Sequence, residues 1–234
     1  MIKVQNLSKS YVVGKKAVDD VSFEVLDGDI FAFVGLNGAG KSTTIKSIVG
    51  ILPFEDGYIE INGKSIVARP IDCKLEMAYV PDNPEVYAYM KGIDYVKFIL
   101  SIYQVPFDEQ EMIELANKLE IYDALGDLVS SYSHGMKQKV QIIAAIIHKP
   151  KLMVLDEPFV GLDPKATHML KEMMKDLASQ GKTIFFSTHV LEVAEKLCNK
   201  VAIIKEGKII AQGKMEDIAG TQGLESVFLG VNNE

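Results

Sequence analysis

The stretch GLNGAGKST, from Gly35 to Thr43, lies between an apolar run, IFAFV, and a segment with helical spacing. It fits the pattern G-x-x-x-x-G-K-[S/T] in the strand-to-helix context that the pattern requires. Glycines let successive backbone N–H groups turn inward around phosphate oxygens, and the helix N-terminus adds partial positive charge. Lys41 is predicted to reach the β- and γ-phosphates, and the Ser42 hydroxyl to ligate Mg²⁺. The predicted phosphate-binding residues are Gly35, Leu36, Asn37, Gly38, Ala39, Gly40, Lys41, Ser42 and Thr43.

Two acids end a second apolar run, in the stretch LMVLDEP from Leu152 to Pro158. Ligands of open α/β sheets collect at the carboxyl ends of the strands. Asp156 is therefore placed to hold Mg²⁺, directly or through water, and Glu157 to orient and deprotonate an attacking water. A strand followed by a solvated acidic turn is the alternative, and the phosphate-binding loop in the same chain favours the catalytic interpretation.

A histidine follows a third apolar run, in the stretch TIFFSTH that ends at His189. A single histidine at the end of a core strand is more often structural than functional. Beside a phosphate-binding loop it has a task, because an imidazole at this edge of the sheet can contact the γ-phosphate and sense its loss. We therefore predict a catalytic role for His189.

Composition narrows the class of protein. The chain has 234 residues, of which 48% are hydrophobic and 24% charged, and this suits one globular unit. Its net charge of −7 argues against nucleic-acid binding, which needs clustered basic charge. Two cysteines, Cys73 and Cys198, indicate a reducing compartment rather than a disulfide scaffold. No apolar run approaches the roughly 20 residues that span a bilayer, so we expect no direct membrane insertion.

Strand and helix patterns alternate along the chain, which predicts a largely parallel sheet. Between residues 83 and 148 helical sequence patterns dominate, and we expect this segment to be a helical subdomain inserted into the α/β core. We therefore expect a single domain over residues 1–234. Within it, residues 1–82 and 149–219 form the nucleotide-binding core and residues 220–234 a short tail.

Several short motifs occur in a specific order: the phosphate-binding loop, YSHGM at Tyr132–Met136, LDEP, GLDP at Gly161–Pro164, and STH. This order resembles the ATP-binding subunit of ABC transporters, and the match covers nearly the whole chain. The resemblance implies an α/β fold in which a P-loop NTPase core carries an N-terminal antiparallel β subdomain and an inserted α-helical subdomain. It also implies ATP and Mg²⁺ as ligands.

The resemblance assigns further roles to the motifs. Gly35–Thr43 is similar to the Walker A motif and Leu152–Asp156 to Walker B. Glu157 matches the catalytic glutamate, Asp163 the acid of a loop that crosses to a second subunit, and His189 the switch histidine.

The resemblance also places an adenine-binding surface near the N-terminus. Tyr11 lies where the family stacks an aromatic side chain on adenine, and Val18 where an apolar residue packs beside it. From the residues alone, packing within a strand is the alternative role for Tyr11.

YSHGM resembles the family signature LSGGQ, with Tyr132, His134 and Met136 as departures. Ser133 and Gly135 are kept, and they offer a hydroxyl and a close backbone N–H at a helix N-terminus. The resemblance implies that they contact the γ-phosphate of ATP held by another subunit. A helix N-cap at Ser133 is the alternative, and both roles can coexist.

A second departure is Asp82, at a position where the family usually has glutamine. An aspartate oxygen suits Mg²⁺, so we predict a metal contact there. The loop leads to Tyr87, Tyr89 and Met90, which are interpreted either as a surface for the membrane subunit or as core packing.

The signature, the acid after YVP and the tail GLESVFLGV look like the type-2 exporter branch of the family. We therefore expect an ATP-hydrolysing motor that powers export through a separate membrane permease, as a homodimer or heterodimer. We expect it in the cytoplasm, at the inner face of the cell membrane. The alternatives are the ATPase of an importer and a soluble ABC ATPase that does not transport.

Overall fold

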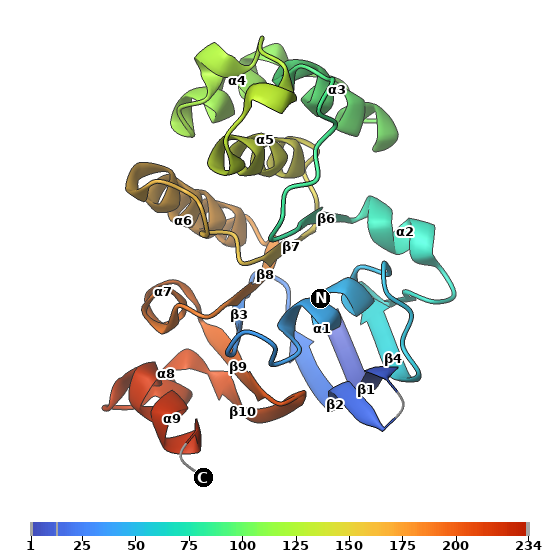
Figure 1. The fold of residues 1–234 in the computed structure, drawn as a ribbon, viewed down its shortest axis with the longest axis vertical. Coiled ribbons are helices and arrows are strands. Elements are labelled where there is room, and N and C mark those ends of the chain that lie inside the picture. The colour runs from blue at the N-terminus through green and yellow to red at the C-terminus, as the bar shows by residue number, and fades with distance from the viewer. Residues whose placement is uncertain (1, 13, 233–234) are drawn as a thin grey trace.

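The computed structural model describes residues 2–12 and 14–232, and within these ranges the strands form two sheets (Figure 1). The strands are β1 (Ile2–Val12), β2 (Lys15–Val25), β3 (Ile30–Val34), β4 (Asp56–Ile61), β5 (Lys64–Ser65), β6 (Met77–Val80), β7 (Leu152–Asp156), β8 (Thr183–Thr188), β9 (Lys200–Lys205) and β10 (Lys208–Lys214). The α-helices are α1 (Lys41–Ile48), α2 (Pro70–Leu75), α3 (Gly92–Ile102), α4 (Glu109–Lys118), α5 (His134–Ile147), α6 (Pro164–Ser179), α7 (Leu191–Leu197), α8 (Met215–Ala219) and α9 (Gly223–Asn232). Two short 3₁₀ helices lie at Tyr122–Ala124 and Val129–Ser131.

The larger sheet has the strand order β10-β9-β3-β8-β7-β6. All its neighbours are parallel except the β9–β10 hairpin, which is antiparallel. The register sets Val34 opposite Thr188 and Asp156 opposite Ser187. The carboxyl ends of β3, β7 and β8 therefore meet at one edge of the sheet, where the three predicted active-site stretches come together.

Alternation along the central strands divides the core between the two faces of this sheet. On β3, Phe31 and Phe33 join one buried cluster while Ala32 and Val34 join the other. Phe23, from the smaller sheet, stacks on Phe31, Phe33 and Phe185 with ring centroids 5.4–5.5 Å apart. Such aromatic stacking adds to the free energy gained by burial, so it ties the two sheets together.

The smaller sheet is antiparallel, with the order β2-β1-β4-β5. Its apolar side chains and those of α1 share one buried cluster with one face of the larger sheet, while α5 and α6 contribute to the apolar cluster on the other face. The expected fold class, an α/β core with an antiparallel β subdomain and a helical insertion, is confirmed. The short helix α2 falls in a stretch for which the sequence analysis made no prediction.

The segment between the adjacent parallel strands β6 and β7 contains α3, α4 and α5, which form a lobe at one end of the molecule (Figure 1). Just before α3, Tyr87 and Tyr89 are 59% and 93% exposed. The Tyr87 ring still packs edge-on against Phe98. Core packing, one of the two interpretations of this cluster, therefore does not describe Tyr89.

No helix within the described ranges is both long enough and apolar enough to cross a membrane.

One buried contact joins the helical lobe to the larger sheet. His148, which follows the last turn of α5, stacks on Tyr103 with ring centroids 3.9 Å apart, and the Tyr103 hydroxyl donates to the Met77 carbonyl of β6. The His148 ring is buried, and its Nδ1 lies 2.9 Å from the Ala144 carbonyl oxygen. Burial lowers the pKa of His148 below its ordinary value of 6.5.

This shift predicts acid sensitivity. Below pH 6.5 the unfolded chain binds a proton at His148 more readily than the folded chain does, so the free energy of unfolding falls as the pH is lowered. We expect His148→Phe, which keeps an aromatic ring against Tyr103, to reduce the loss of thermal stability between about pH 7.5 and pH 5.5. Melting curves across this range measure the effect. His168→Gln, at an exposed position of α6, is the control, and an equal pH response of wild type and His148→Phe would contradict the prediction.

Candidate active site

The phosphate-binding loop depends on glycine at two close approaches of the backbone. A Cβ atom on Gly35 would lie 2.5 Å from the Ile204 carbonyl oxygen, and one on Gly40 would lie 2.5 Å from the Ala17 carbonyl oxygen. Gly40 also has φ +109°, in the left-handed region that side chains disfavour. The loop therefore packs tightly against neighbouring backbone between β3 and α1. Because glycine has no side chain, nothing from these two positions fills the inside of the loop.

Lys41 supplies a buried positive charge at the floor of this loop. Its side chain is 6% exposed, and its ammonium donates to the carbonyl oxygens of Gly35 at 2.8 Å and Leu36 at 3.2 Å. The same ammonium lies 3.1 Å from Glu157 Oε1, an ion pair. A buried charge needs such compensation, so loop, lysine and glutamate hold one another in place.

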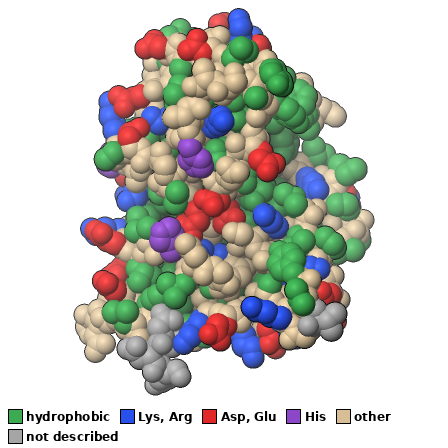
Figure 2. All heavy atoms as spheres, in the orientation of Figure 1, with side chains coloured by type: hydrophobic (Ala, Val, Ile, Leu, Met, Phe, Trp, Pro, Cys, Tyr) green, Lys and Arg blue, Asp and Glu red, His purple; other side chains and the backbone are tan. Residues whose placement is uncertain are grey.

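The acids end at the same edge of the sheet. Asp156 is the last residue of β7 and is 2% exposed, and Glu157 follows it at 8%. Glu157 Oε2 accepts from His189 Nδ1 at 3.0 Å and from the His189 backbone N–H at 3.3 Å. Glu157 thus bridges Lys41 and His189, so the structure brings the three residues with predicted catalytic roles into contact. Figure 2 shows acidic side chains gathered at the middle of this face, with histidine side chains on two sides.

A cavity of about 340 Å³ lies over the loop and this glutamate. Its lining residues are Tyr11, Ala17, Leu36, Asn37, Gly38, Gly40, Lys41, Ser42, Thr43, Asp82 and Glu157. The structure therefore brings most of the predicted nucleotide-binding residues, from four separate parts of the chain, to one hollow.

At the predicted adenine-binding surface, the structure differs from the expectation at one residue. Tyr11 lines the cavity, is 62% exposed, and places its hydroxyl 3.2 Å from Thr43 Oγ1. Val18 instead is fully buried in the core, and the preceding residue, Ala17, lines the cavity. The prediction for Val18 is thus corrected, because alternation along β2 turns Val18 to the core and Ala17 to the hollow.

Asp82 lies at the cavity wall, after β6. Burial raises the pKa of its carboxyl, and the negative charges of Asp156 and Glu157 raise it further. An added cation would relieve this crowding of negative charge. Oxygen donors of Ser42, Asp156 and Asp82 are the type that Mg²⁺ prefers, with water and phosphate as its other ligands. Within the described residues no cluster of three or more His, Cys, Asp or Glu could hold a metal ion by itself.

Ser133 and Gly135 do not line the cavity of their own chain. Ser133 caps α5, and its Oγ accepts from the Met136 backbone N–H at 3.3 Å. The cap, one interpretation of this residue, is therefore present. A Cβ atom on Gly135 would lie 2.5 Å from the Gly161 carbonyl oxygen, so the signature turn packs closely on the GLDP loop.

Two side chains that the sequence analysis did not single out reinforce this packing. Gln138 donates to the Pro158 carbonyl at 2.9 Å, and the buried Lys139 pairs with Asp163 at 2.7 Å. The hydrogen bond from Lys139 lowers the pKa of the Asp163 carboxyl. Asp163 Oδ1 also accepts from the Ala166 N–H and so caps α6. The pattern that could have revealed the ion pair is a lysine in an otherwise buried helix segment, since such a charge requires a partner.

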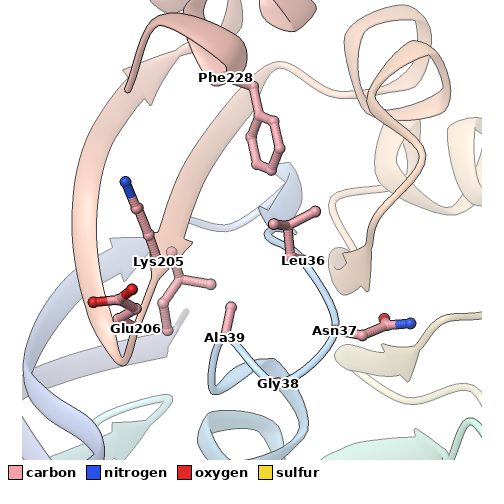
Figure 3. A pocket seen from close by; sticks show the side chains of 8 residues that line it. Leu36, Asn37, Gly38, Ala39, Lys205, Glu206 and Phe228 are labelled. Carbon is pink, nitrogen blue, oxygen red and sulfur yellow. The ribbon is translucent and has the colours of Figure 1, made fainter. Parts of the chain in front are cut away.

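A second hollow, of about 180 Å³, lies beside the phosphate-binding loop (Figure 3). Phe228 of α9 points toward Leu36 there, while Lys205 and Glu206 approach from the β9–β10 hairpin (Figure 3). The predicted tail thus lies against the loop, on a side that the sequence analysis did not anticipate.

Fold and site together define the class: a P-loop nucleoside triphosphatase with an antiparallel β subdomain and a helical insertion. A family model described as ABC transporter matches residues 18–160, which is more than half of the chain. The chain therefore belongs to the ABC transporter family, as an ATP-binding subunit.

Individual relatives agree with this assignment. The uncharacterised ABC transporter ATP-binding protein MJ1023 of Methanocaldococcus jannaschii is 40% identical over 219 residues, covering 93% of this chain and 79% of the relative. The linearmycin resistance ATP-binding protein LnrL of Bacillus subtilis is 32% identical over 231 residues, covering 97% and 74%. A solved ATP-binding subunit of an ABC transporter is 33% identical and superimposes with a TM-score of 0.91 over 99% of both chains.

The glycine geometry yields a prediction about ATP binding. Gly40→Ala should weaken ATP binding at least roughly tenfold and cost roughly 1–3 kcal/mol of stability, because the new methyl group meets the Ala17 carbonyl and the backbone is left-handed. A fluorescent ATP analogue and thermal denaturation measure the two effects.

Gly63→Ala is the matched control. Gly63 has φ +77°, yet a Cβ atom there meets nothing within 4 Å. This variant should lose stability through backbone strain alone and bind ATP like the wild type. Unchanged ATP binding by Gly40→Ala would contradict the assigned role of the loop.

Proposed function

We propose that the chain is the ATP-hydrolysing motor of an ABC exporter, acting in a pair of ATPase subunits on a separate membrane permease. The observation that carries the hydrolytic part is the placement of Glu157, held between Lys41 and His189 beside the phosphate-binding loop. The resistance-related name of the relative LnrL supports export over import.

The residues of the loop bind and orient the triphosphate. Backbone N–H groups of the loop and the N-terminus of α1 face phosphate oxygens, and Tyr11 with Ala17 forms the wall for the base. Lys41 is held by the Gly35 and Leu36 carbonyls, so its ammonium keeps its place in the loop when a phosphate oxygen replaces Glu157 Oε1 as its third partner. Ser42, Asp156 and Asp82 would hold Mg²⁺, which when bound neutralises charge on the phosphates.

Glu157 provides the base in this proposal. Phosphate oxygens compete with Glu157 Oε1 for the Lys41 ammonium, while Oε2 stays bound to His189. A carboxylate released from its lysine is a stronger acceptor for a proton from water. His189 keeps the Glu157 carboxylate oriented through its hydrogen bond to Oε2. The imidazole of His189 is thereby held close to where the γ-phosphate would lie.

The second half of the site comes from the other subunit in this proposal. Ser133 and Gly135 lie at the start of a 14-residue helix and outside the cavity of their own chain. A γ-phosphate held by the second subunit would meet this helix N-terminus and complete the contacts. ATP then drives closure, because it binds the closed pair more tightly than the open one.

The permease is proposed to bind at the exposed aromatic surface before α3. Tyr89 is 93% exposed and Tyr87 59%, and large aromatic side chains are enriched in protein interfaces. In this proposal the subunit lies at the cytoplasmic face of the cell membrane. The identity of the cargo would then be set by the permease.

One substitution tests the chemistry. Glu157→Gln should bind ATP normally and lose roughly 10²–10⁴-fold in turnover, because the amide cannot accept the proton from water. ATP binding, phosphate release and size-exclusion chromatography with ATP are measured together, and an ATP-bound dimer should accumulate. Glu192→Gln, on the exposed surface of α7, is the control. Turnover near the wild-type rate would contradict the role of Glu157.

A cap exchange tests the contribution of Ser133 across the pair. Ser133→Asp keeps an N-cap of similar strength but sets a negative charge where a γ-phosphate should bind. We expect unchanged melting temperature and ATP binding in the isolated subunit, with loss of both ATP-driven dimerisation and turnover. Gly135 is unsuited to this test, because any side chain there would meet the Gly161 carbonyl oxygen.

The reverse exchange, Asp108→Ser at the N-cap of α4, controls for the effect that exchanging serine and aspartate at an N-cap has on helix stability. It should leave ATP-driven dimerisation and turnover at the wild-type level. If Ser133→Asp loses ATP binding as an isolated subunit, the stretch serves its own chain's site or its fold instead.

A further inference from the structure

A fully buried serine links the two acids of the site through one hydroxyl group. Ser187, on β8, donates to Asp156 Oδ1 at 2.6 Å and accepts from the Glu157 backbone N–H at 3.0 Å. The parallel register places Ser187 directly beside Asp156. The hydroxyl therefore uses its donor and an acceptor site on consecutive residues of the neighbouring strand.

Glu157 needs such a support because of its backbone. Its φ is +47°, in the left-handed region that residues other than glycine seldom adopt. The turn that follows is closed by the Val160 N–H, which donates to the Glu157 carbonyl at 3.1 Å. Strained conformations of this kind persist only where surrounding contacts enforce them. The hydrogen bond from the Glu157 N–H to Ser187 holds this residue where the chain leaves β7.

The neighbouring groups have separate tasks. The Thr188 hydroxyl accepts from the Val190 N–H at 3.0 Å, within the turn after β8. His189 holds the carboxylate end of Glu157 through Oε2, and Lys41 pairs with Oε1. The side chain of Glu157 is thus oriented by His189 and Lys41, and its backbone by Ser187.

We propose that Ser187 is a positioning residue for the hydrolysis reaction: it sets the direction in which Glu157 leaves β7 and fixes the carboxylate of Asp156. The inference rests on the proposed function, since it assigns Ser187 its effect through Glu157. Without the hydroxyl, the Glu157 N–H is buried without its partner and the left-handed turn relaxes. The carboxylate then samples directions away from the attacking water, so turnover falls while the phosphate-binding loop is untouched.

The test is the kinetic behaviour of Ser187→Ala in the full chain. At saturating magnesium, which offsets any weaker hold on Asp156, kcat should fall roughly 10- to 100-fold. KM for ATP and the affinity for a fluorescent ATP analogue should stay within about threefold of the wild-type values, because the Ser187 hydroxyl bonds to Asp156 and Glu157 and not to the phosphate-binding loop. Ser187→Cys, which keeps the side-chain shape with a weak hydrogen-bonding group, should show the same selective loss of kcat.

The matched control is Thr183→Val. Thr183 lies at the opposite end of the same strand, is also buried, and donates through its hydroxyl to the Leu26 carbonyl at 3.3 Å. This variant removes a part-buried side-chain hydrogen bond from β8 and should keep the wild-type kcat. If both variants lose turnover in proportion to their loss of thermal stability, Ser187 is merely structural and the proposal fails.

A trapping experiment separates this inference from the proposed function. In the variant that combines Glu157→Gln with Ser187→Ala, the ATP-bound dimer should form as with Glu157→Gln alone, since Ser187 acts on the base and not on binding. Loss of that dimer would overturn the proposal. If Glu157→Gln arrests turnover while Ser187→Ala hydrolyses ATP at the wild-type kcat, the positioning role fails and the motor function stands. If Glu157→Gln itself keeps its activity, the proposed function fails first.

Discussion

The buried ammonium of Lys41 is the constraint around which the site is organised. A charge that is only 6% exposed has to be surrounded by acceptors, and here these are two carbonyls of the loop and the carboxylate of Glu157. The loop cannot open without exposing those carbonyls, and Glu157 cannot turn away without removing the countercharge. The pair therefore couples a phosphate-binding element after β3 to a hydrolytic element after β7, although Lys41 and Glu157 are far apart in sequence.

The parallel register of three strands makes this coupling possible. β3, β8 and β7 are neighbours, so the residues that follow their carboxyl ends share one edge, and each strand delivers a different chemical group. β3 delivers the glycine-rich loop, β7 the acids, and β8 both the Ser187 hydroxyl and His189. A shift of one residue between β7 and β8 would take Ser187 away from Asp156, and it would turn buried side chains to the opposite face.

Much of this could be predicted from the sequence, because the decisive motifs are local. The phosphate-binding loop, the two acids and the histidine each follow an apolar run, and that pattern alone predicts their place in the sheet. The errors and omissions have a different origin. Ala17 replaces Val18 at the cavity because alternation along β2 turns Val18 to the core, and which face of a strand meets the core is decided by the elements that pack against it. Ser187 and the Lys139–Asp163 pair depend on which strands and helices become neighbours, and that is decided by tertiary packing.

The contacts of α5 tie this helix to the loop that follows Glu157. Its first turn packs on Gly161, Gln138 binds the Pro158 carbonyl and Lys139 pairs with Asp163, so the helix rests on the loop that directly follows Glu157. Moving the N-terminus of α5 without this loop would leave Lys139 buried beside no countercharge, which costs more free energy than moving both. Under the proposed function the N-terminus of α5 grips the other subunit's phosphate. Within that proposal, a contact made there would reach the chain's own Glu157 through the close packing of Gly135 on Gly161 and the ion pair of the buried Lys139 with the half-exposed Asp163.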